Sequence, residues 1–323
     1  MIFRTPHYYS EFRCIADKCK DNCCIGWEID IDDETAEKYK SITGEFGKRL
    51  NENIDFSEQP CFILGENERC PFLNNRNLCD IITELGENCL CQICDDHPRY
   101  YEWFGNIKEG GVGLCCEEAA RIILNSPLPF SYVESEIEED NYSEVDEEMF
   151  SLVFDVRDEI FSVLNDENCP INTAFSRVME IVENYIELPE NHKTTKEILE
   201  FMTSLEAMDE NWLPTLKNAL ERFDELNANK KQYMAENPNA EKYMRNLAIY
   251  YIWRHFLKAT FDGEIYSRAA FAIASTNITS TLWELKWLDS GISADDFVEI
   301  AKNYSKEIEY SEDNTYALLE VLY

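Results

Sequence analysis

Cysteines dominate the first part of this chain. Twelve of the 13 cysteines lie within the first 116 of 323 residues, and four of them fall in the stretch from Cys14 to Cys24. Thiols this dense either form disulfides or bind a metal, because thiolates are strong ligands for zinc and for iron–sulfur clusters. Pairs separated by a few residues direct two sulfurs to one centre, and Cys91-x2-Cys94 has this spacing.

The composition favours a metal over disulfides. The chain is too long to need disulfides for folding, and an odd total of 13 cysteines cannot pair completely. Residues 1–7 turn polar before an apolar signal segment develops, so we expect a cytoplasmic protein, where clustered cysteines are more often ligands than bridges. A full disulfide framework is the alternative for an exported protein. Spacing does not choose between zinc and a 4Fe–4S cluster, since both accept thiolates.

Not every cysteine needs to be a ligand. Cys23 and Cys24 are adjacent, so we expect their side chains to point apart, which indicates two sites or one ligand beside a core thiol. His97, near Cys94, is predicted to be a hydrogen-bonded structural residue rather than a ligand. Four further cysteines are predicted to be small buried side chains: Cys61, Cys89, Cys115 and Cys169.

The chain is strongly acidic. Its net charge is -35, from 64 acidic and 29 basic residues. Such a surface repels nucleic acids and anionic lipids, so we expect neither nucleic acid nor membrane as a partner. It attracts metal cations or lysine-rich proteins, although solubility alone also explains the charge. The longest apolar run of the second half, residues 247–253, is too short to cross a bilayer.

The residue patterns predict a mainly α fold with two domains, of which the first would position the cysteines. Residues 1–130 are predicted to form an irregular Cys-rich α+β metal-binding domain with short strands. Residues 131–148 are strongly acidic and are predicted to be a linker or loop. Residues 149–323 are predicted to form an all-α helical domain, because their apolar residues recur with helical spacing.

Local signals predict individual elements. An Asn-rich turn between Cys70 and Cys79 predicts a hairpin that brings the two thiols together. Asp32 or Asp33 is predicted to cap a helix that Gly44 and Gly47 interrupt, and Asn172 and Ser293 are predicted N-caps. Strands are predicted over residues 27–31 and 62–64, a second hairpin over 100–113, and helices over 81–85, 117–124, 149–165, 171–187, 194–208, 212–226, 239–261, 264–288 and 293–308.

Longer motifs occur in both halves of the chain. The first half contains Cys19-x3-Cys23-Cys24-x-Gly26-Trp27, Cys70-Pro71-Phe72-Leu73 with Leu78-Cys79, and Cys116 with Glu118-Ala119-Ala120-Arg121. The second half contains Tyr304-Ser305-Lys306-Glu307-Ile308-Glu309-Tyr310-Ser311 and Asn314. Together these motifs resemble the flagellin lysine-N-methylase family over nearly the whole chain. The first part also resembles small bacterial proteins described as zinc- or iron-chelating cysteine clusters.

The resemblance implies methyl transfer from S-adenosylmethionine to lysine side chains of flagellin or a similar surface protein, with an iron–sulfur cluster. The sequence departs from the family pattern at His97, where an aromatic residue is usual, and at Cys115, which is an extra cysteine. The ligand pool that the resemblance implies consists of Cys14, Cys19, Cys23, Cys24, Cys70, Cys79, Cys94 and Cys116.

Methylation of a lysine needs a neutral amine and groups that help remove its proton. The candidates are Tyr304, Glu307 and Glu309, of which Tyr304 and Glu307 share a face at helical spacing. A solvated helix end is the alternative explanation of this acidic stretch. Arg254 and Lys258, one turn apart, are candidates to bind the carboxylate of S-adenosylmethionine, and salt bridges on the helix flank are the alternative.

A rival interpretation comes from another class of protein. The cysteines could belong to a non-enzymatic zinc- or iron-binding protein that stores the metal or uses it for structure. Such a protein needs no cofactor pocket, whereas methyl transfer requires a pocket lined from the helical part.

Overall fold

The computed structural model describes residues 1–139, 142–186 and 192–322. The chain forms two compact units. The larger one, which we call the helical unit, comprises Met1–Phe12, Tyr101–Cys115 and Ala119–Tyr323. The smaller one, the Cys-rich unit, comprises Arg13–Tyr100 and Cys116–Glu118. This division differs from the predicted boundaries after residues 130 and 148, because the N-terminal strand pairs with later strands inside the helical unit.

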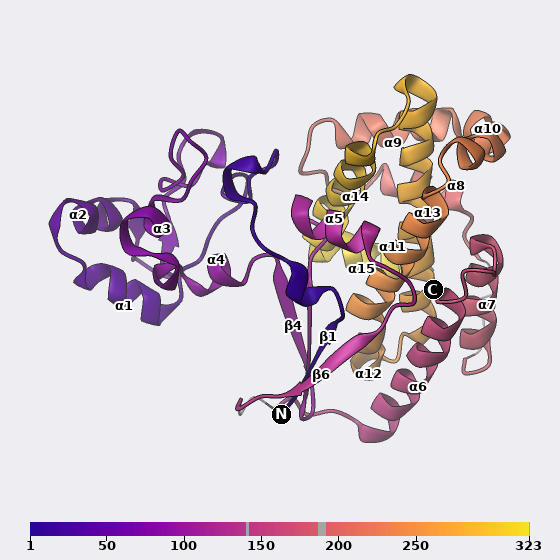
Figure 1. Cartoon of the computed structure of the whole chain (residues 1–323), viewed down its shortest axis with the longest axis horizontal. Helices are drawn as coiled ribbons and strands as arrows, with labels where there is room; N and C mark the ends of the chain where they lie inside the picture. The colour runs from indigo at the N-terminus through magenta and orange to yellow at the C-terminus, as the bar shows by residue number, and fades with distance from the viewer. Residues whose placement is uncertain (140–141, 187–191, 323) are drawn as a thin grey trace. The chain divides into compact units, whose positions relative to one another are not determined.

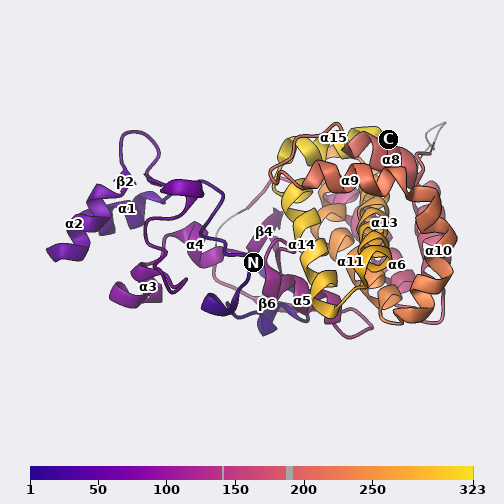
Figure 2. The same cartoon turned by 90° about the horizontal axis from the view of Figure 1, so that it is seen from above.

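Helices form most of the helical unit (Figure 1). The long helix α13 lies at the centre of the helical unit, and it packs against α7, α10, α11, α14 and α15 (Figure 2). The helices are α5 (Glu117–Asn125), α6 (Glu147–Leu164), α7 (Ile171–Glu183), α8 (Thr195–Met202), α9 (Trp212–Glu221), α10 (Phe223–Glu236), α11 (Ala240–His255), α12 (Ala259–Asp262), α13 (Ile265–Ser290), α14 (Ala294–Glu309) and α15 (Glu312–Leu322).

The central position of α13 depends on short polar side chains that bond within their own helix. Ser275, Thr276 and Thr279 are all buried. The hydroxyls of Thr276 and Thr279 donate to the carbonyl oxygens of Ala272 and Ser275, each at 2.8 Å. Because these hydroxyls find acceptors one turn back, neighbouring helices can pack closely against them without leaving a buried polar group unpaired.

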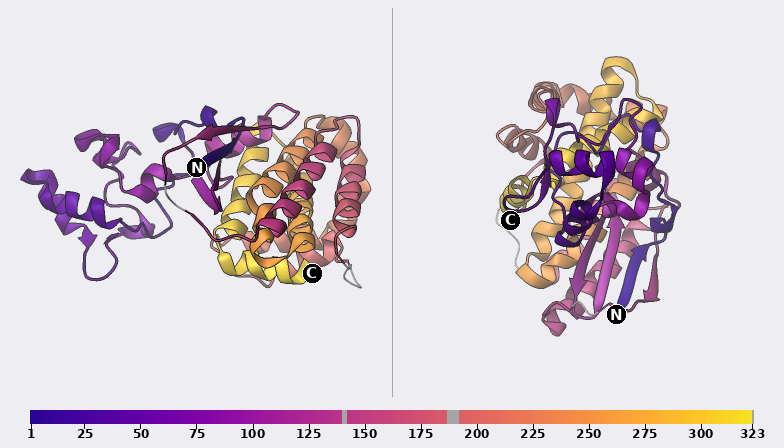
Figure 3. Two further views of the ribbon diagram at one scale, coloured as in Figure 1. Left: turned by 90° about the horizontal axis from the view of Figure 1, so that it is seen from below. Right: turned by 90° about the vertical axis from the view of Figure 1, so that its left-hand side faces the viewer.

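A four-stranded sheet pairs the first strand of the chain with strands that follow much later in the sequence (Figure 3). The strands are β1 (Ile2–Pro6), β4 (Arg99–Phe104), β5 (Ile107–Val112) and β6 (Tyr132–Glu136), in the order β4-β5-β1-β6. Strand β1 runs parallel to β5 and antiparallel to β6. The hairpin expected over residues 100–113 is therefore confirmed. The prediction of a linker over 131–148 is wrong for β6, because its backbone completes the sheet edge beside β1; residues 140–141 of that range lie outside the described residues.

The Cys-rich unit is small and irregular. Its elements are α1 (Asp33–Ser41), α2 (Gly44–Glu52), β2 (Ile54–Asp55), β3 (Cys61–Phe62), α3 (Asp80–Leu85) and α4 (Gln92–Asp96). Asp32 caps α1 as predicted, because its carboxylate accepts the backbone N–H of Thr35 at 2.9 Å. The same side chain accepts the N–H of Gln92 at 2.8 Å, so one carboxylate caps two helices.

Two local predictions for this unit are wrong. The helix that Asp32 caps, α1, already ends at Ser41, and Gly44 and Gly47 lie in the next helix, α2, instead of interrupting α1. Gly44 has a φ of +87° at the helix start, and a Cβ on Gly47 would lie 2.0 Å from the carbonyl oxygen of Ile42, so both positions require glycine. Within the described residues, the expected strand over 27–31 is reduced to one isolated bridge, between Asp30 and Cys61.

The helical predictions hold better than their boundaries. The helices expected over 149–165, 171–187, 194–208, 264–288 and 293–308 are present, with ends shifted by up to six residues, and residue 187 lies outside the described residues. Ser293 caps α14 in a capping box with Asp296, as predicted. Asn172 is not an N-cap, because α7 begins one residue earlier, after Pro170. Helices α10 and α15 were not predicted. No helix in the described ranges combines the length and apolarity that crossing a membrane requires.

Candidate active site and cysteine cluster

A buried carboxylate lies at the C-terminal end of α14. The side chain of Glu309 is fully shielded from solvent. Its Oε1 accepts from Nε2 of His255 at 2.7 Å and lies 3.3 Å from Nε of Arg254. Its Oε2 accepts from the Ser305 hydroxyl at 2.6 Å, and the Tyr250 hydroxyl lies 3.1 Å from Oε1. Helix α11 supplies three of these partners because Tyr250, Arg254 and His255 are spaced by about one turn.

The surroundings keep this carboxylate ionised. Burial alone would raise the pKa of Glu309, but the Arg254 charge and the hydrogen bonds from His255 and Ser305 hold it below its ordinary value. Burial lowers the pKa of His255 to about 4, although the hydrogen bond and the charge of Glu309 act to raise it. His255 is therefore neutral at neutral pH. Its Nε2 must carry the proton, because an ionised carboxylate can only accept.

Three tyrosines line this region. The Tyr250 hydroxyl accepts from Nη1 of Arg254 at 2.6 Å and from the backbone N–H of Leu114 at 3.2 Å, and it donates to Glu309. The Tyr304 hydroxyl donates to the Ser275 hydroxyl at 2.9 Å. The Tyr251 ring lies between them, with centroids 5.2 Å from Tyr250 and 6.2 Å from Tyr304. We call Tyr250, Tyr251, Arg254, His255, Tyr304, Ser305 and Glu309 the Glu309 network.

The structure brings three of the five predicted catalytic and cofactor residues together. Arg254, Tyr304 and Glu309 belong to the Glu309 network. Glu307 faces elsewhere, where its carboxylate accepts the backbone N–H groups of Met208 and Asp209 at 2.9 and 2.8 Å. Lys258 forms an ion pair with Glu102 at 2.7 Å. The roles of these five residues in methyl transfer stay predictions.

The solvated helix end that was the alternative for the acidic stretch is wrong, because Glu307 and Glu309 are both buried. Sequence reasoning also missed Tyr250, Tyr251 and His255. Their signal was present, since polar aromatic side chains interrupt the apolar run that begins at residue 247.

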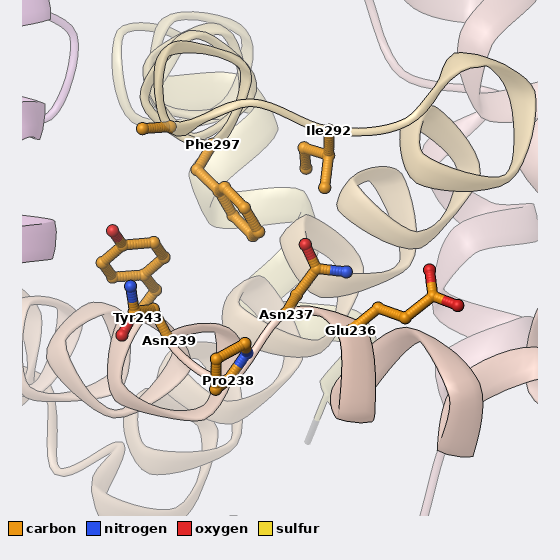
Figure 4. Close-up of a pocket in the computed structure, with 8 residues that line it drawn as sticks. Glu236, Asn237, Pro238, Asn239, Tyr243, Ile292 and Phe297 are labelled. Carbon is orange, nitrogen blue, oxygen red and sulfur yellow. The ribbon is translucent and has the colours of Figure 1, made fainter.

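A separate pocket of about 220 Å³ opens at the other end of the same helices (Figure 4). The rings of Tyr243 and Phe297 lie on one side of it and Glu236 on the other. Tyr243 and Phe297 belong to the first turns of α11 and α14, whereas Glu309 ends α14. The pocket is therefore not part of the Glu309 network. Its lining residues are Glu236, Asn237, Pro238, Asn239, Tyr243, Ile292, Ala294 and Phe297.

Five thiols gather at the core of the Cys-rich unit. Two of them are buried within its apolar cluster and three pack against that cluster, as Cys89 outside this set also does. They interact electrostatically, so that the charge of one thiolate raises the pKa of others. Cys70 and Cys79 come together through their turn, as predicted. We call this set, which consists of Cys24, Cys70, Cys79, Cys91 and Cys94, the thiol cluster.

Hydrogen bonds couple thiols in and beside this cluster. The bond from Cys94 lowers the pKa of Cys91 against the effect of burial, and the same bond together with burial raises the pKa of Cys94. Cys23 and Cys24 also share a hydrogen bond, which with burial raises the pKa of Cys24. The expectation that these neighbours point apart is therefore wrong, because the two thiols, which lie in a turn, are close enough to share a hydrogen bond.

The remaining predicted ligands lie outside the thiol cluster. The Cys19 thiol donates to the carbonyl oxygen of Asp21 at 2.8 Å and lies 3.6 Å from Oε2 of Glu117. Burial raises the pKa of Cys19 to about 12, and Cys116 is near enough to add to this effect. Cys14 is exposed. The predicted pool of eight thus divides between at least two places. Cys91, which the pool did not include, joins the thiol cluster, as its spacing to Cys94 indicated.

The four cysteines predicted to be buried differ in their exposure to solvent. Cys115 and Cys169 are buried, as predicted, and Cys115 donates to the Tyr310 hydroxyl at 2.8 Å. Cys61 and Cys89 are only half-buried, so the prediction of burial is wrong for them. The His97 ring packs against Trp27, with 5.8 Å between ring centroids.

The donor chemistry of the thiol cluster suits a soft metal, because thiolates in apolar surroundings are ligands for zinc and iron–sulfur clusters. Among residues 1–139, 142–186 and 192–322, however, no three Cys, His, Asp or Glu side chains converge on a point that would hold a metal ion. The thiols would have to close around an ion to bind it.

Comparison with known proteins identifies relatives. The family model described as the FliB lysine N-methylase C-terminal domain matches residues 120–323. The flagellar biosynthetic protein FliU of Salmonella muenchen is 29% identical over 129 residues, which are 38% of this chain and 76% of that protein. The lysine-N-methylases of Salmonella typhimurium (strain LT2) and Salmonella choleraesuis (strain SC-B67) are each 28% identical over 129 residues, 38% of this chain and 32% of their own length.

The match thus spans about a third of the length of the two lysine-N-methylases. No solved structure matches the chain. The family model covers the region from α5 to α15, which contains the whole Glu309 network and more than half of the sequence. The chain therefore belongs to the FliB lysine N-methylase family.

Proposed function

We propose that this chain is a protein-lysine N-methyltransferase that transfers a methyl group from S-adenosylmethionine to lysine side chains of flagellin or a similar surface protein. The observation that carries the proposal is the Glu309 network, a buried carboxylate held by Arg254 and His255 inside the region that the family model matches. The names of the related lysine-N-methylases support the same class of reaction. A cytoplasmic location, and the absence of nucleic acid and membrane partners, stay predictions.

The reaction defines what the network would have to do. A lone pair of the lysine nitrogen forms the new N–C bond as the C–S bond of the sulfonium breaks, and the amine must first lose a proton. A negative carboxylate attracts the lysine cation, and dry surroundings favour the neutral amine. Glu309 already receives hydrogen bonds on both oxygens and has a lowered pKa, so it is a weak base. We infer that Glu309 orders the network while a tyrosine contacts the amine.

Two basic side chains are candidates to bind the carboxylate of S-adenosylmethionine. The side chain of Arg254 is 15% exposed and that of Lys258 is 38% exposed, so both reach the edge of the protein. Arg254 keeps its ion pair with Glu309 in this proposal, and its charge attracts the carboxylate of the cofactor. Lys258 would exchange its pairing with Glu102 for the cofactor, which a surface ion pair permits at small cost.

For the Cys-rich unit we propose a bound metal, either a 4Fe–4S cluster or zinc. The thiol cluster supplies the ligands, so Cys91 joins four of the predicted ligands, Cys24, Cys70, Cys79 and Cys94. Cys14, Cys19, Cys23 and Cys116 stay candidates for a second set. A bound cluster or zinc would supply structural stability to this unit, whose core is small. The thiol cluster also favours the second candidate function, a non-enzymatic metal-binding protein.

One experiment separates the two functions. The full chain, purified without oxygen, is incubated with labelled S-adenosylmethionine and flagellin, and lysine methylation is measured by mass spectrometry. A matched flagellin with reductively dimethylated lysines is the control. Label on unmodified lysines supports the methyltransferase. Metal binding without any methyl transfer to flagellin or to other lysine-bearing surface proteins would contradict it and favour the metal-binding protein.

A further inference from the structure

The Tyr251 side chain has an unusual environment. It is fully buried in α11, and within the part of the chain that the structure describes its hydroxyl has no hydrogen-bond partner. Aromatic rings surround it, with centroids 5.9 Å away for Phe271 and 6.4 Å for His255. A buried hydroxyl without a partner costs about 1–3 kcal/mol. A phenylalanine would avoid this cost, so the hydroxyl needs an explanation.

The other tyrosines of the Glu309 network show what the Tyr251 hydroxyl lacks. Tyr250 donates to Glu309, and Tyr304 donates to Ser275. Tyr251 lies between these two rings and within electrostatic range of Glu309 and Arg254. Burial raises its pKa well above the ordinary value, so it remains a neutral phenol. Its oxygen is therefore available both as a donor and as an acceptor.

We propose that the hydroxyl of Tyr251 is a catalytic group that contacts the amine of the substrate lysine. This inference rests on the proposed function and names the group that handles the amine. The phenol oxygen would accept an N–H of the neutral amine and so direct the nitrogen lone pair at the methyl carbon. The proton that the amine loses beforehand goes to solvent, so the tyrosine itself is unchanged at the end of the reaction.

The surroundings suit a lysine better than a larger polar ligand. A lysine stem is narrow and apolar, and it matches the aromatic side chains of His255, Phe271 and Tyr304 that pack against the Tyr251 ring. The nearby Glu309 carboxylate would attract the ammonium end. An ordered water is the competing partner, because water often satisfies a buried polar group.

The chain offers a matched control at Tyr233. This tyrosine, in α10, is also fully buried, and its hydroxyl likewise lacks a partner among the described residues. It packs against Trp287, with 5.7 Å between ring centroids, and its charged neighbour is Glu284. Tyr233 is not part of the Glu309 network. Tyr233→Phe and Tyr251→Phe thus remove the same atom from similar surroundings, but only one removes it from the candidate active site.

The test measures thermal midpoints, kcat and KM for methyl transfer by the full-length wild type and both variants. We expect both variants to melt at or above the wild-type temperature, since neither loses a hydrogen bond. We expect kcat to fall about 10-fold or more for Tyr251→Phe, with an unchanged KM for S-adenosylmethionine, and to be unchanged for Tyr233→Phe.

Each other outcome counts against the inference. Equal kcat for Tyr251→Phe and wild type overturns it, and a lowered melting temperature with unchanged kcat identifies a water as the partner. A wild type that methylates no lysine overturns the proposed function and this inference with it. If Tyr251→Phe does not fold, 3-fluorotyrosine at position 251 replaces it, because fluorine changes the acidity of the hydroxyl at almost constant size. An unchanged kcat would then overturn the inference.

Discussion

His255 donates a hydrogen bond to Glu309, with 2.7 Å between Nε2 and Oε1, although the two residues are 54 positions apart in the sequence. Both side chains are almost completely buried. The pair couples the end of α11 to the end of α14, and Arg254 balances its negative charge. Because a buried neutral histidine resists protonation, the pair makes the protein sensitive to acid.

The stability of the helical unit should fall as the pH drops from about 6.5 to about 4. His255 has a pKa of about 4 in the folded chain and 6.5 when unfolded. Between pH 6.5 and about 4, His255 is protonated in the unfolded chain but neutral in the folded chain. Protonation therefore favours unfolding as the pH falls. The shift corresponds to roughly 3 kcal/mol in the free energy of unfolding.

The variant His255→Gln isolates this effect. Glutamine can still donate to Glu309 but does not titrate. Denaturant unfolding of both proteins at several pH values should show a difference in stability that changes by roughly 3 kcal/mol across the window and is constant above pH 7. Parallel pH profiles for the two proteins would show that His255 titrates normally.

Glu309→Gln should abolish methyl transfer and reduce stability. The substitution removes the charge that balances Arg254, whose side chain is only 15% exposed. Leaving a largely buried cation without its partner costs about 3 kcal/mol. Methylation assays and thermal unfolding of the variant measure the two effects. Retention of more than half of the wild-type rate would remove Glu309 from the catalytic machinery.

Glu307→Gln should keep methyl transfer while reducing stability by about 1 kcal/mol. The Glu307 carboxylate holds the backbone N–H groups of Met208 and Asp209, which indicates a structural task. A glutamine has one acceptor oxygen in place of two, so one of these bonds should weaken. The same assays as for Glu309→Gln apply. A large loss of transfer at unchanged stability would restore Glu307 as a catalytic residue.

The pair Glu109–Arg157 should be the most sensitive ion pair outside the site. Both nitrogen–oxygen distances are 2.7 Å, and the Arg157 side chain is fully buried beside the Trp253 ring. Glu109→Gln should cost about 3–5 kcal/mol in denaturant unfolding, because it leaves a buried guanidinium unpaired. The double variant Glu109→Leu with Arg157→Met should recover most of this loss. Equal losses in the single and double variants would contradict the ion-pair explanation.

The proposed metal site predicts that Cys70→Ser lowers the metal content of the protein and that Cys61→Ser leaves it unchanged. Cys70 lies in the thiol cluster, whereas the neighbours that affect the Cys61 thiol are the acidic side chains of Glu28, Asp30 and Asp55. Metal content and the visible spectrum of anaerobically purified protein measure the difference. Equal metal content in both variants would place the ligands elsewhere, and the Cys19 and Cys116 pair would be tested next.

Local chemistry made much of this architecture predictable from sequence. The capping box at Ser293, the cap at Asp32 and the turn between Cys70 and Cys79 each depend on residues a few positions apart. Helical periodicity likewise indicated most of the helices and the mainly α class. These features survive because near neighbours in a sequence must also be near neighbours in space.

The sequence alone also showed which reactive groups the chain contains: the dense thiols, the many acidic side chains and the motif with Tyr304 and Glu309. Only the tertiary structure decided which of these groups meet. It brought the turn with Cys70 and Cys79 beside Cys91 and Cys94, and β6 to the sheet edge beside β1. It also surrounded Glu309 with His255 and Arg254. Burial and long-range packing produce these groupings, and neither is encoded in the spacing of residues along one segment.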